Sequence, residues 1–302
     1  TEDELLEAKS NNYLVTLCGV YGQYALASIE LSTGTFEVQS IKKDAIPGAL
    51  SALSPGEVLL QDGGTFDRVY ITSILKTQIT FEPASFFHEN NAQNALQSAF
   101  SVQALDALGN FTAAEISACG ALIRYIERTQ VGKLPYLSPP RQILNTEVMH
   151  IDAATRRSLE LTKTSAGERS GSLLDSIDHT ITSAGGRLLQ SHLSAPLTDI
   201  KSIQGRLDMA SCFIEDPQTH QNVQEHLKST PDIERAIGRL SAGRGGPRDL
   251  LMLRSGLEQS EIIRASLQQS DTARAVFNTQ LEAMSQKPET AKLLDRLKIA
   301  LI

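Results

Sequence analysis

The sequence predicts an α/β domain followed by an all-α region. Residues 13–41 contain three runs rich in β-branched and aromatic residues, separated by short Gly-containing turns, and this pattern is typical of antiparallel strands. From residue 151 onward, apolar residues recur at three- and four-residue steps, which predicts helices. A length of 302 residues fits about two domains of ~150 residues, each able to bury a core.

The α/β domain is predicted to begin with an antiparallel meander and to continue with alternating helices and strands. Residues 1–10 have helical character that ends before Asn11-Asn12. Strands are expected at Tyr13–Cys18, Tyr24–Glu30, Thr35–Ile41, Glu57–Leu60 and Gln78–Phe81. Helices are expected at Ala45–Leu53, before Gln78, and within Phe86–Leu108.

A domain boundary is expected at Gly109-Asn110, where Gly and Asn break the helical pattern. The amphipathic helix Phe111–Thr129 then opens the helical region, with Thr112 and Glu115 placed as a capping box. Residues 132–147 are too rich in proline for a helix, so we expect an extended segment on the surface of the helical domain.

Capping residues and prolines predict the later helices. Asp152 lies in the first turn of a helix over 151–161, where a carboxylate favours the positive end of the helix dipole. Thr182 or Ser183 can cap a helix that Pro196 ends. Thr198 or Asp199 can cap the next, and the apolar stripe of that helix is Ile200, Ile203, Leu207, Ala210 and Ile214.

Three further helix starts place a residue able to cap before a proline: Asp216-Pro217, Thr230-Pro231 and Gly246-Pro247. After Thr230, Glu234, Arg235 and Arg239 can pair at helical spacing. Two long helical segments, 248–269 and 272–302, complete the region. Long helices fit a lever that joins distant parts of a larger protein, and the alternative for this stretch alone is a helical bundle complete in itself.

Composition and charge exclude several classes of protein. The net charge is −7, and residues 1–140 hold 8 Lys and Arg against 15 Asp and Glu, so this half is disfavoured as a surface for a phosphate backbone. The widely spaced Cys18, Cys119 and Cys212 are expected to be reduced and buried. No apolar stretch is long enough to span a bilayer, and the acidic N-terminal sequence is not a signal peptide. Because the first residue is not Met and the last helix ends mid-pattern, we expect a fragment.

Motifs for chemistry are absent from the sequence. It has neither a phosphate-binding loop nor G-x-G-x-x-G, and its six histidines never form H-E-x-x-H. We therefore expect no catalytic, metal-binding or nucleotide-binding residues in this chain.

Several long segments resemble the MutS family of DNA mismatch repair proteins, in the order in which that family has them. IDAATRR, SLLDSIDHTITSAGGRLLQSHLSAPLTD, IQGRLD and DIERAIGRLSAGRGGPRDL resemble the family's core, or lever, domain. NNYLVTLCGVYGQYALASIELSTGTFEV is similar to its connector domain, which implies an RNase H-like fold. The implied division is residues 1–12 as the end of a linker from an absent recognition domain, 13–109 as connector, and 110–302 as core, cut before or at the clamp.

The resemblance implies a role in mismatch repair. The fragment would connect the recognition, clamp and ATPase domains, transmit conformational change and offer a docking surface for MutL. It would lack the family's C-terminal ATPase and hence the ATP and Mg²⁺ that this domain binds. The implied partners are mismatched duplex DNA, mainly through absent domains, MutL, and a second copy in the full-length protein, without a membrane. The implied location is the bacterial cytoplasm, associated with the nucleoid.

The resemblance also singles out twelve family-signature positions with a structural role. They are Asp152, Arg156, Arg157, Gly186, Arg187, Pro196, Arg206, Glu234, Arg235, Pro247, Arg248 and Asp249. The arginines among them either bond helix ends and carboxylates such as Asp152, Asp208 and Asp249, or contact DNA or nucleotide directly. For Arg187 we expect a bond to a neighbouring helix terminus, so that Arg187→Ala costs roughly 1 to 3 kcal/mol.

Two alternative functions remain at this point. An RNase H-like nuclease needs carboxylates for two metal ions, one of them on the first strand, and YLVTLC has none; Glu30 and Glu37, at strand ends, are expected to be solvated. A MutS relative that acts as a clamp on recombination intermediates would share both domains.

Overall fold

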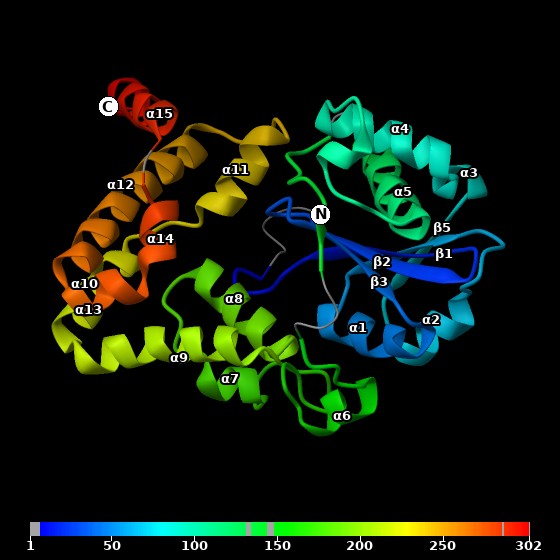
Figure 1. Cartoon of the computed structure of the whole chain (residues 1–302), viewed down its shortest axis with the longest axis horizontal. Helices are drawn as coiled ribbons and strands as arrows, with labels where there is room; N and C mark the ends of the chain where they lie inside the picture. The colour runs from blue at the N-terminus through cyan, green and yellow to red at the C-terminus, as the bar shows by residue number, and fades with distance from the viewer. Residues whose placement is uncertain (1–6, 131–133, 144–147, 286, 302) are drawn as a thin grey trace. The chain divides into compact units, whose positions relative to one another are not determined.

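The computed structural model describes residues 7–130, 134–143, 148–285 and 287–301 (Figure 1). It divides into two compact units, which we term the α/β unit, Thr1–Ile177 with Gln190–Pro196, and the helical unit, Asp178–Leu189 with Leu197–Ile302. A mixed sheet with helices comes first and a helical region follows, so the predicted fold class is confirmed.

The described part of the α/β unit contains one six-stranded mixed sheet, in the order β5-β4-β1-β2-β3-β6. The expected meander is present, because β1 (Tyr13–Val20), β2 (Gln23–Glu30) and β3 (Phe36–Ile41) pair antiparallel. The next two strands, β4 (Glu57–Gln61) and β5 (Gln78–Glu82), extend the sheet in parallel beyond β1.

Strands β1, β2 and β4 are buried on both faces through their central residues, which explains why those residues are mostly apolar. On β1, Leu14 and Cys18 enter one hydrophobic cluster, whereas Val15 and Leu17 enter another. Helices on the two sides complete these clusters (Figure 1). The Val15 face is covered by α1 (Ile46–Leu53) and α2 (Arg68–Ile74), and the Leu14 face by α3 (Ala84–Phe87), α4 (Glu89–Phe100) and α5 (Ala113–Thr129).

The position of α5 corrects the domain boundary predicted at Gly109. The helix begins with the predicted capping box, in which Thr112 accepts from Glu115 N–H and Glu115 accepts from Thr112 N–H. It packs on β1 and β2, with Leu122 and Ile123 fully buried, so it belongs to the α/β unit. A Cβ on Gly120 would lie 2.3 Å from Ala92, which shows how closely α5 approaches α4.

The proline-rich segment also lies elsewhere than predicted. Its described residues include β6 (Arg141–Gln142), which pairs in parallel with β3, and Ser138 N–H donates to the Gly34 carbonyl. This part of the segment therefore completes the edge of the sheet instead of lying on the helical domain. Residues 132–133 and 144–147 of the prediction lie outside the described residues.

The expectation of continuous helix from Ile151 is wrong. Between Ile151 and residue 178, only α6 (Ala153–Ser158) and α7 (Leu173–Ile177) are helical, and Asp152 is the N-cap of α6. Between them, Glu160 adopts a positive φ of 47° and accepts hydrogen bonds from Ser165, which fixes a compact loop.

Most helices of the helical unit begin at the predicted capping residues, and two predictions for this unit need correction. It contains α8 (Ser183–Ser194) in part, α9 (Ile200–Glu215), α10 (Pro217–Lys228), α11 (Ile233–Ser241), α12 (Pro247–Gln269), α13 (Asp271–Val276), α14 (Asn278–Ala283) and α15 (Pro288–Ala300). Thr182, Asp199 and Asp216 cap their helices as expected. However, α11 is capped by Asp232 and not by Thr230, and residues 272–302 form three helices instead of one.

The core of the helical unit lies among α9, α10, α12, α13 and α14. Its buried residues include Cys212, Val223, Ile263 and Phe277. Two short 3-10 helices, Lys43–Ala45 and Leu105–Ala107, also lie in the described part of the α/β unit. Within the described residues, no helix combines the length and apolar character needed to cross a membrane.

Candidate functional site: ion pairs that fix helix α11

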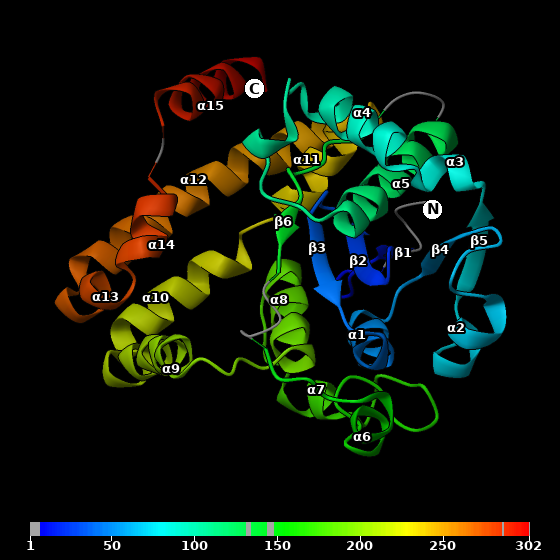
Figure 2. The same ribbon diagram turned by 45° about the vertical axis from the view of Figure 1, so that its right-hand side comes forward.

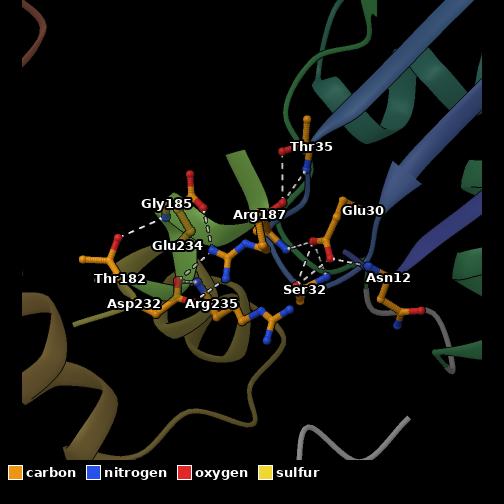
Figure 3. Close-up of polar contacts among 11 residues, drawn as sticks. Asn12, Glu30, Ser32, Thr35, Thr182, Gly185, Arg187, Asp232, Glu234 and Arg235 are labelled. Atoms are coloured by element: carbon orange, nitrogen blue, oxygen red, sulfur yellow. Dashed lines mark hydrogen bonds and ion pairs between the residues drawn. The ribbon is translucent and has the colours of Figure 1, made fainter. Parts of the chain in front are cut away.

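Arg187 on α8 binds the N-terminus of α11 (Figure 3). Figure 2 shows the ribbons of these two helices. Its guanidinium donates to both carboxylate oxygens of Asp232, at 2.6 and 3.0 Å, and to Glu234 at 2.9 Å. Asp232 at the same time caps α11, because Oδ1 accepts from the Arg235 backbone N–H at 3.3 Å. The bond from Arg187 to a helix terminus is the one expected from the sequence, and this contact lies within the helical unit.

The pair is desolvated, which strengthens its electrostatic interaction. Side-chain exposure is 5% for Arg187 and 15% for Asp232, but 58% for Glu234. Burial opposes ionisation of Asp232, yet the hydrogen bonds and charge of Arg187 outweigh it and hold the pKa of Asp232 below its usual value. Likewise, burial disfavours the cation at Arg187, but its two carboxylate partners raise its pKa overall. Both groups therefore stay charged at neutral pH, and the pair fixes α8 to α11.

A second ion pair fixes the other end of α11 to α12. Arg239 Nε donates to Asp249 Oδ1 at 2.7 Å, and Asp249 Oδ2 accepts from the Gly246 backbone N–H at 2.9 Å. Burial opposes the charge on Asp249, but its bonds to Gly246 and Arg239 lower the pKa of this carboxyl. One carboxylate thus joins an arginine to the start of α12, as Asp232 does at the start of α11.

Close backbone packing accompanies these ion pairs. A Cβ on Gly256 of α12 would lie 2.1 Å from Ile233 Cγ2, at the start of α11. Helix α11 is therefore held at its N-terminus by Arg187, at its C-terminal half by Arg239, and along its first turn by direct contact with α12.

In the α/β unit, Glu30 and Glu37, the carboxylates considered for metal binding, bind other groups of the protein. Glu30 is 2% exposed, so the expectation that it is solvated is wrong. Its oxygens accept from the backbone N–H groups of Asn12, Ser32 and Thr33, which ties down the β2–β3 turn (Figure 3). Glu37 pairs with Arg141. In the part of the chain that the structure describes, no three His, Cys, Asp or Glu side chains are grouped as metal ligands.

The three cysteines are buried and free, as expected. Burial raises the pKa of the Cys18 thiol to about 12 and also raises the pKa of Cys119 and of Cys212. These thiols are protonated at neutral pH, and a protonated thiol is a poor nucleophile.

Comparison with protein families accounts for both units. The family model for MutS domain II matches residues 12–138, and the one for MutS domain III matches residues 154–300. The chain belongs to the MutS family. The domain II match extends through α5 to residue 138, in agreement with the packing of that helix on the sheet.

Curated MutS relatives align along most of the chain. A protein of a Ruegeria species, named DNA mismatch repair protein MutS, is 42% identical over 272 residues, which cover 90% of this chain and 31% of the relative. The protein of the same name from Roseobacter denitrificans is 36% identical over 302 residues, which cover 100% of this chain and 34% of the relative. The chain therefore spans about a third of the length of these MutS relatives.

The structure describes all twelve positions that the resemblance to the MutS family singled out. Arg187, Glu234, Arg235 and Asp249 contribute to the bonds around α11, and Pro247 is the first residue of α12. Gly186 is buried within α8, and the Pro196 carbonyl accepts from Met149 N–H. Asp152 caps α6, whose Arg156 is buried; Arg157 and Arg248 are exposed, and Arg206 is partly exposed.

Two members of this network were not predicted as partners. The cap was predicted at Thr230 because a proline follows it. The residue that caps the helix is Asp232, which stands three residues before Arg235 and accepts from its backbone N–H. Arg239 was expected to pair within its own helix, but it reaches Asp249 instead.

Proposed function

We propose that this chain is the connector and core part of a MutS-type protein in DNA mismatch repair, and that it transmits conformational change between the other domains. The proposal is supported by the matches to MutS domains II and III in that order, together with relatives named as mismatch repair proteins at 36–42% identity. The alternative of a clamp for recombination intermediates is not favoured, since the relatives compared here carry the mismatch repair name.

The geometry of the helical unit supports transmission. Helix α12 has 23 residues, so it is about 35 Å long. Its start is bonded to α11 through Asp249, and α11 is bonded to α8 through Arg187. A displacement of one helix would therefore move the others as a connected body, and allosteric coupling needs such an element with discrete arrangements.

The same proposal assigns the partners. Mismatched DNA would be read by domains outside this chain, ATP and Mg²⁺ would bind a C-terminal ATPase, and the full-length protein would dimerise in the cytoplasm. This piece alone would not hydrolyse ATP. The α/β unit would offer the docking surface for MutL, and the acidic charge of residues 1–140 suits a protein partner better than a phosphate backbone.

The test is binding of the 302-residue chain to fluorescent homoduplex and G·T mismatch duplex at low and moderate salt, beside a MutL pull-down. Full-length protein is the positive control. We expect weak binding without mismatch preference, and retained binding to MutL. Mismatch-selective binding by the chain alone, or loss of MutL binding, would contradict the proposal.

A further inference from the structure

Arg156 is a buried arginine whose surroundings differ from those of Arg187. It lies in the middle of α6, and 8% of its surface is exposed. Its Nε and Nη1 are buried and have no hydrogen-bond partner within the described part of the chain. Arg187 is comparably buried but binds two carboxylates.

This arrangement is unfavourable as it stands. A guanidinium remains protonated in proteins, and leaving a buried charge without a partner is strongly destabilising. Burial lowers the pKa of Arg156. The backbone around it is well fixed, since Asp152 accepts from the N–H groups of Ala154 and Thr155 at 2.9 Å. The side chain is therefore held in a buried position while two of its donors remain unused.

The unused donors indicate the chemistry of a missing partner. A guanidinium is a planar fork that matches a carboxylate or a phosphate. A DNA phosphate is the poorer fit, because most of this side chain is enclosed and a duplex backbone approaches exposed side chains. The neighbouring Arg157 is exposed and offers the better position for a phosphate.

We propose that Arg156 receives a carboxylate from a segment of the full-length protein that lies outside these 302 residues, as Arg187 receives Asp232. This inference rests on the proposed function, in which the chain works as part of a MutS-type protein about three times its length. Arg156 is then a point at which the rest of that protein engages α6.

The test compares Arg156→Met with the control Arg157→Met in two contexts, this chain and the full-length protein. Removing an unpaired buried cation should raise the Tm of this chain by about 2–4 °C or more. In the full-length protein the same change would leave a carboxylate unpaired, so we expect the Tm to fall. Arg157→Met should leave both Tm values nearly unchanged.

Local hydrogen exchange gives a second readout that does not require a two-state transition. Amides of α6 should exchange more slowly in the full-length protein than in this chain, and Arg156→Met should remove that difference while Arg157→Met preserves it. A Tm shift of the same sign in both contexts would overturn the proposal. If the carboxylate partner lay within this chain, for example, Arg156→Met would lower the Tm in both contexts.

DNA binding separates this inference from its alternative and from the proposed function. In the full-length protein, Arg156→Met should leave the salt dependence of duplex binding unchanged; a slope smaller by about one would identify a phosphate contact and overturn the proposal. The sign reversal of the Tm shift does not depend on mismatch repair activity. Failure of the DNA and MutL experiment would therefore leave it intact as a separate result.

Discussion

At the scale of single residues, the buried charged side chains of this protein differ in the groups that bind them. The buried Arg187 donates to the mostly buried Asp232 and to the exposed Glu234, whereas the buried Glu30 accepts from backbone N–H groups of a turn. The sequence predicted that Arg187 bonds a helix terminus, because it follows a Gly pair at the start of a helix. It could not predict that Glu30 is buried, because a carboxylate at a strand end has the same pattern whether solvent or backbone satisfies it.

The first prediction concerns Arg187→Ala, which leaves Asp232 partly buried without its cation. We expect a loss of about 1 to 3 kcal/mol in unfolding free energy, measured by urea denaturation followed by circular dichroism. The control Arg157→Ala removes an exposed arginine and should stay within about 0.5 kcal/mol of the parent. Equal effects for the two variants would show that the Asp232 contact does not stabilise the fold.

The same pair should make stability depend on acid. Since the pKa of Asp232 is lower in the folded protein than its usual 3.8, the contribution of Asp232 is present above that value and is lost as the pH falls through the folded pKa. Unfolding free energy should therefore fall more steeply below pH 3.8 in the parent than in Asp232→Asn. Parallel pH profiles for the two proteins would argue against this pairing.

At the scale of helices and strands, local sequence patterns predicted where helices begin better than which elements those helices pack against. Caps at Thr112, Asp199 and Asp216 were correct because capping uses residues within one turn. The pattern of α5 showed an apolar face but not that the sheet covers it. The predicted stripe of α9 is mostly exposed in the described structure, with Ile200 at 79% and Ile214 at 78%, so a helical pattern alone did not reveal what it packs against.

The third prediction uses glycines on two helices of the helical unit. Gly256→Ala places a methyl group where the Ile233 side chain already lies, so either that side chain must shift or α11 and α12 must move apart, and we expect a cost of about 1–3 kcal/mol. Gly205→Ala on α9 meets nothing within 4 Å and should stabilise by about 0.5–1 kcal/mol, because alanine loses less entropy in a helix. Thermal melts of both variants check the signs. A neutral Gly256→Ala would mean that Ile233 moves aside freely.

At the scale of the whole molecule, the order of fold classes could be predicted, but the boundary between the units could not. The break at Gly109-Asn110 is a real interruption between α4 and α5, yet both helices cover the same face of the sheet. The two-residue strand β6 is too short to show a periodic pattern, and its partner β3 is far away in the sequence. Sequence periodicity reports local geometry, whereas both of these features depend on contacts between distant segments.

The fourth prediction tests that boundary. A protein ending at residue 109 lacks α5, whose buried residues include Leu122, Ile123 and Ile126, so only α3 and α4 remain to cover the Leu14 face of the sheet. We expect it to bind a hydrophobic dye and to unfold without a cooperative transition. A protein ending at residue 143 retains α5 and β6 and should unfold cooperatively. Cooperative unfolding of the shorter protein would show that α5 is dispensable for the sheet.

The pairing of β6 with β3 has a consequence for synthesis of the protein. Glu37 and Arg141 are 104 residues apart in the sequence, so at the usual 5–20 residues per second the ribosome adds the second strand roughly 5–20 s after the first. During that interval the outer edge of β3 has no strand beside it, and open strand edges pair readily with other chains. The nascent α/β unit therefore passes through a period of exposure to aggregation that ends only when residue 142 has left the ribosome.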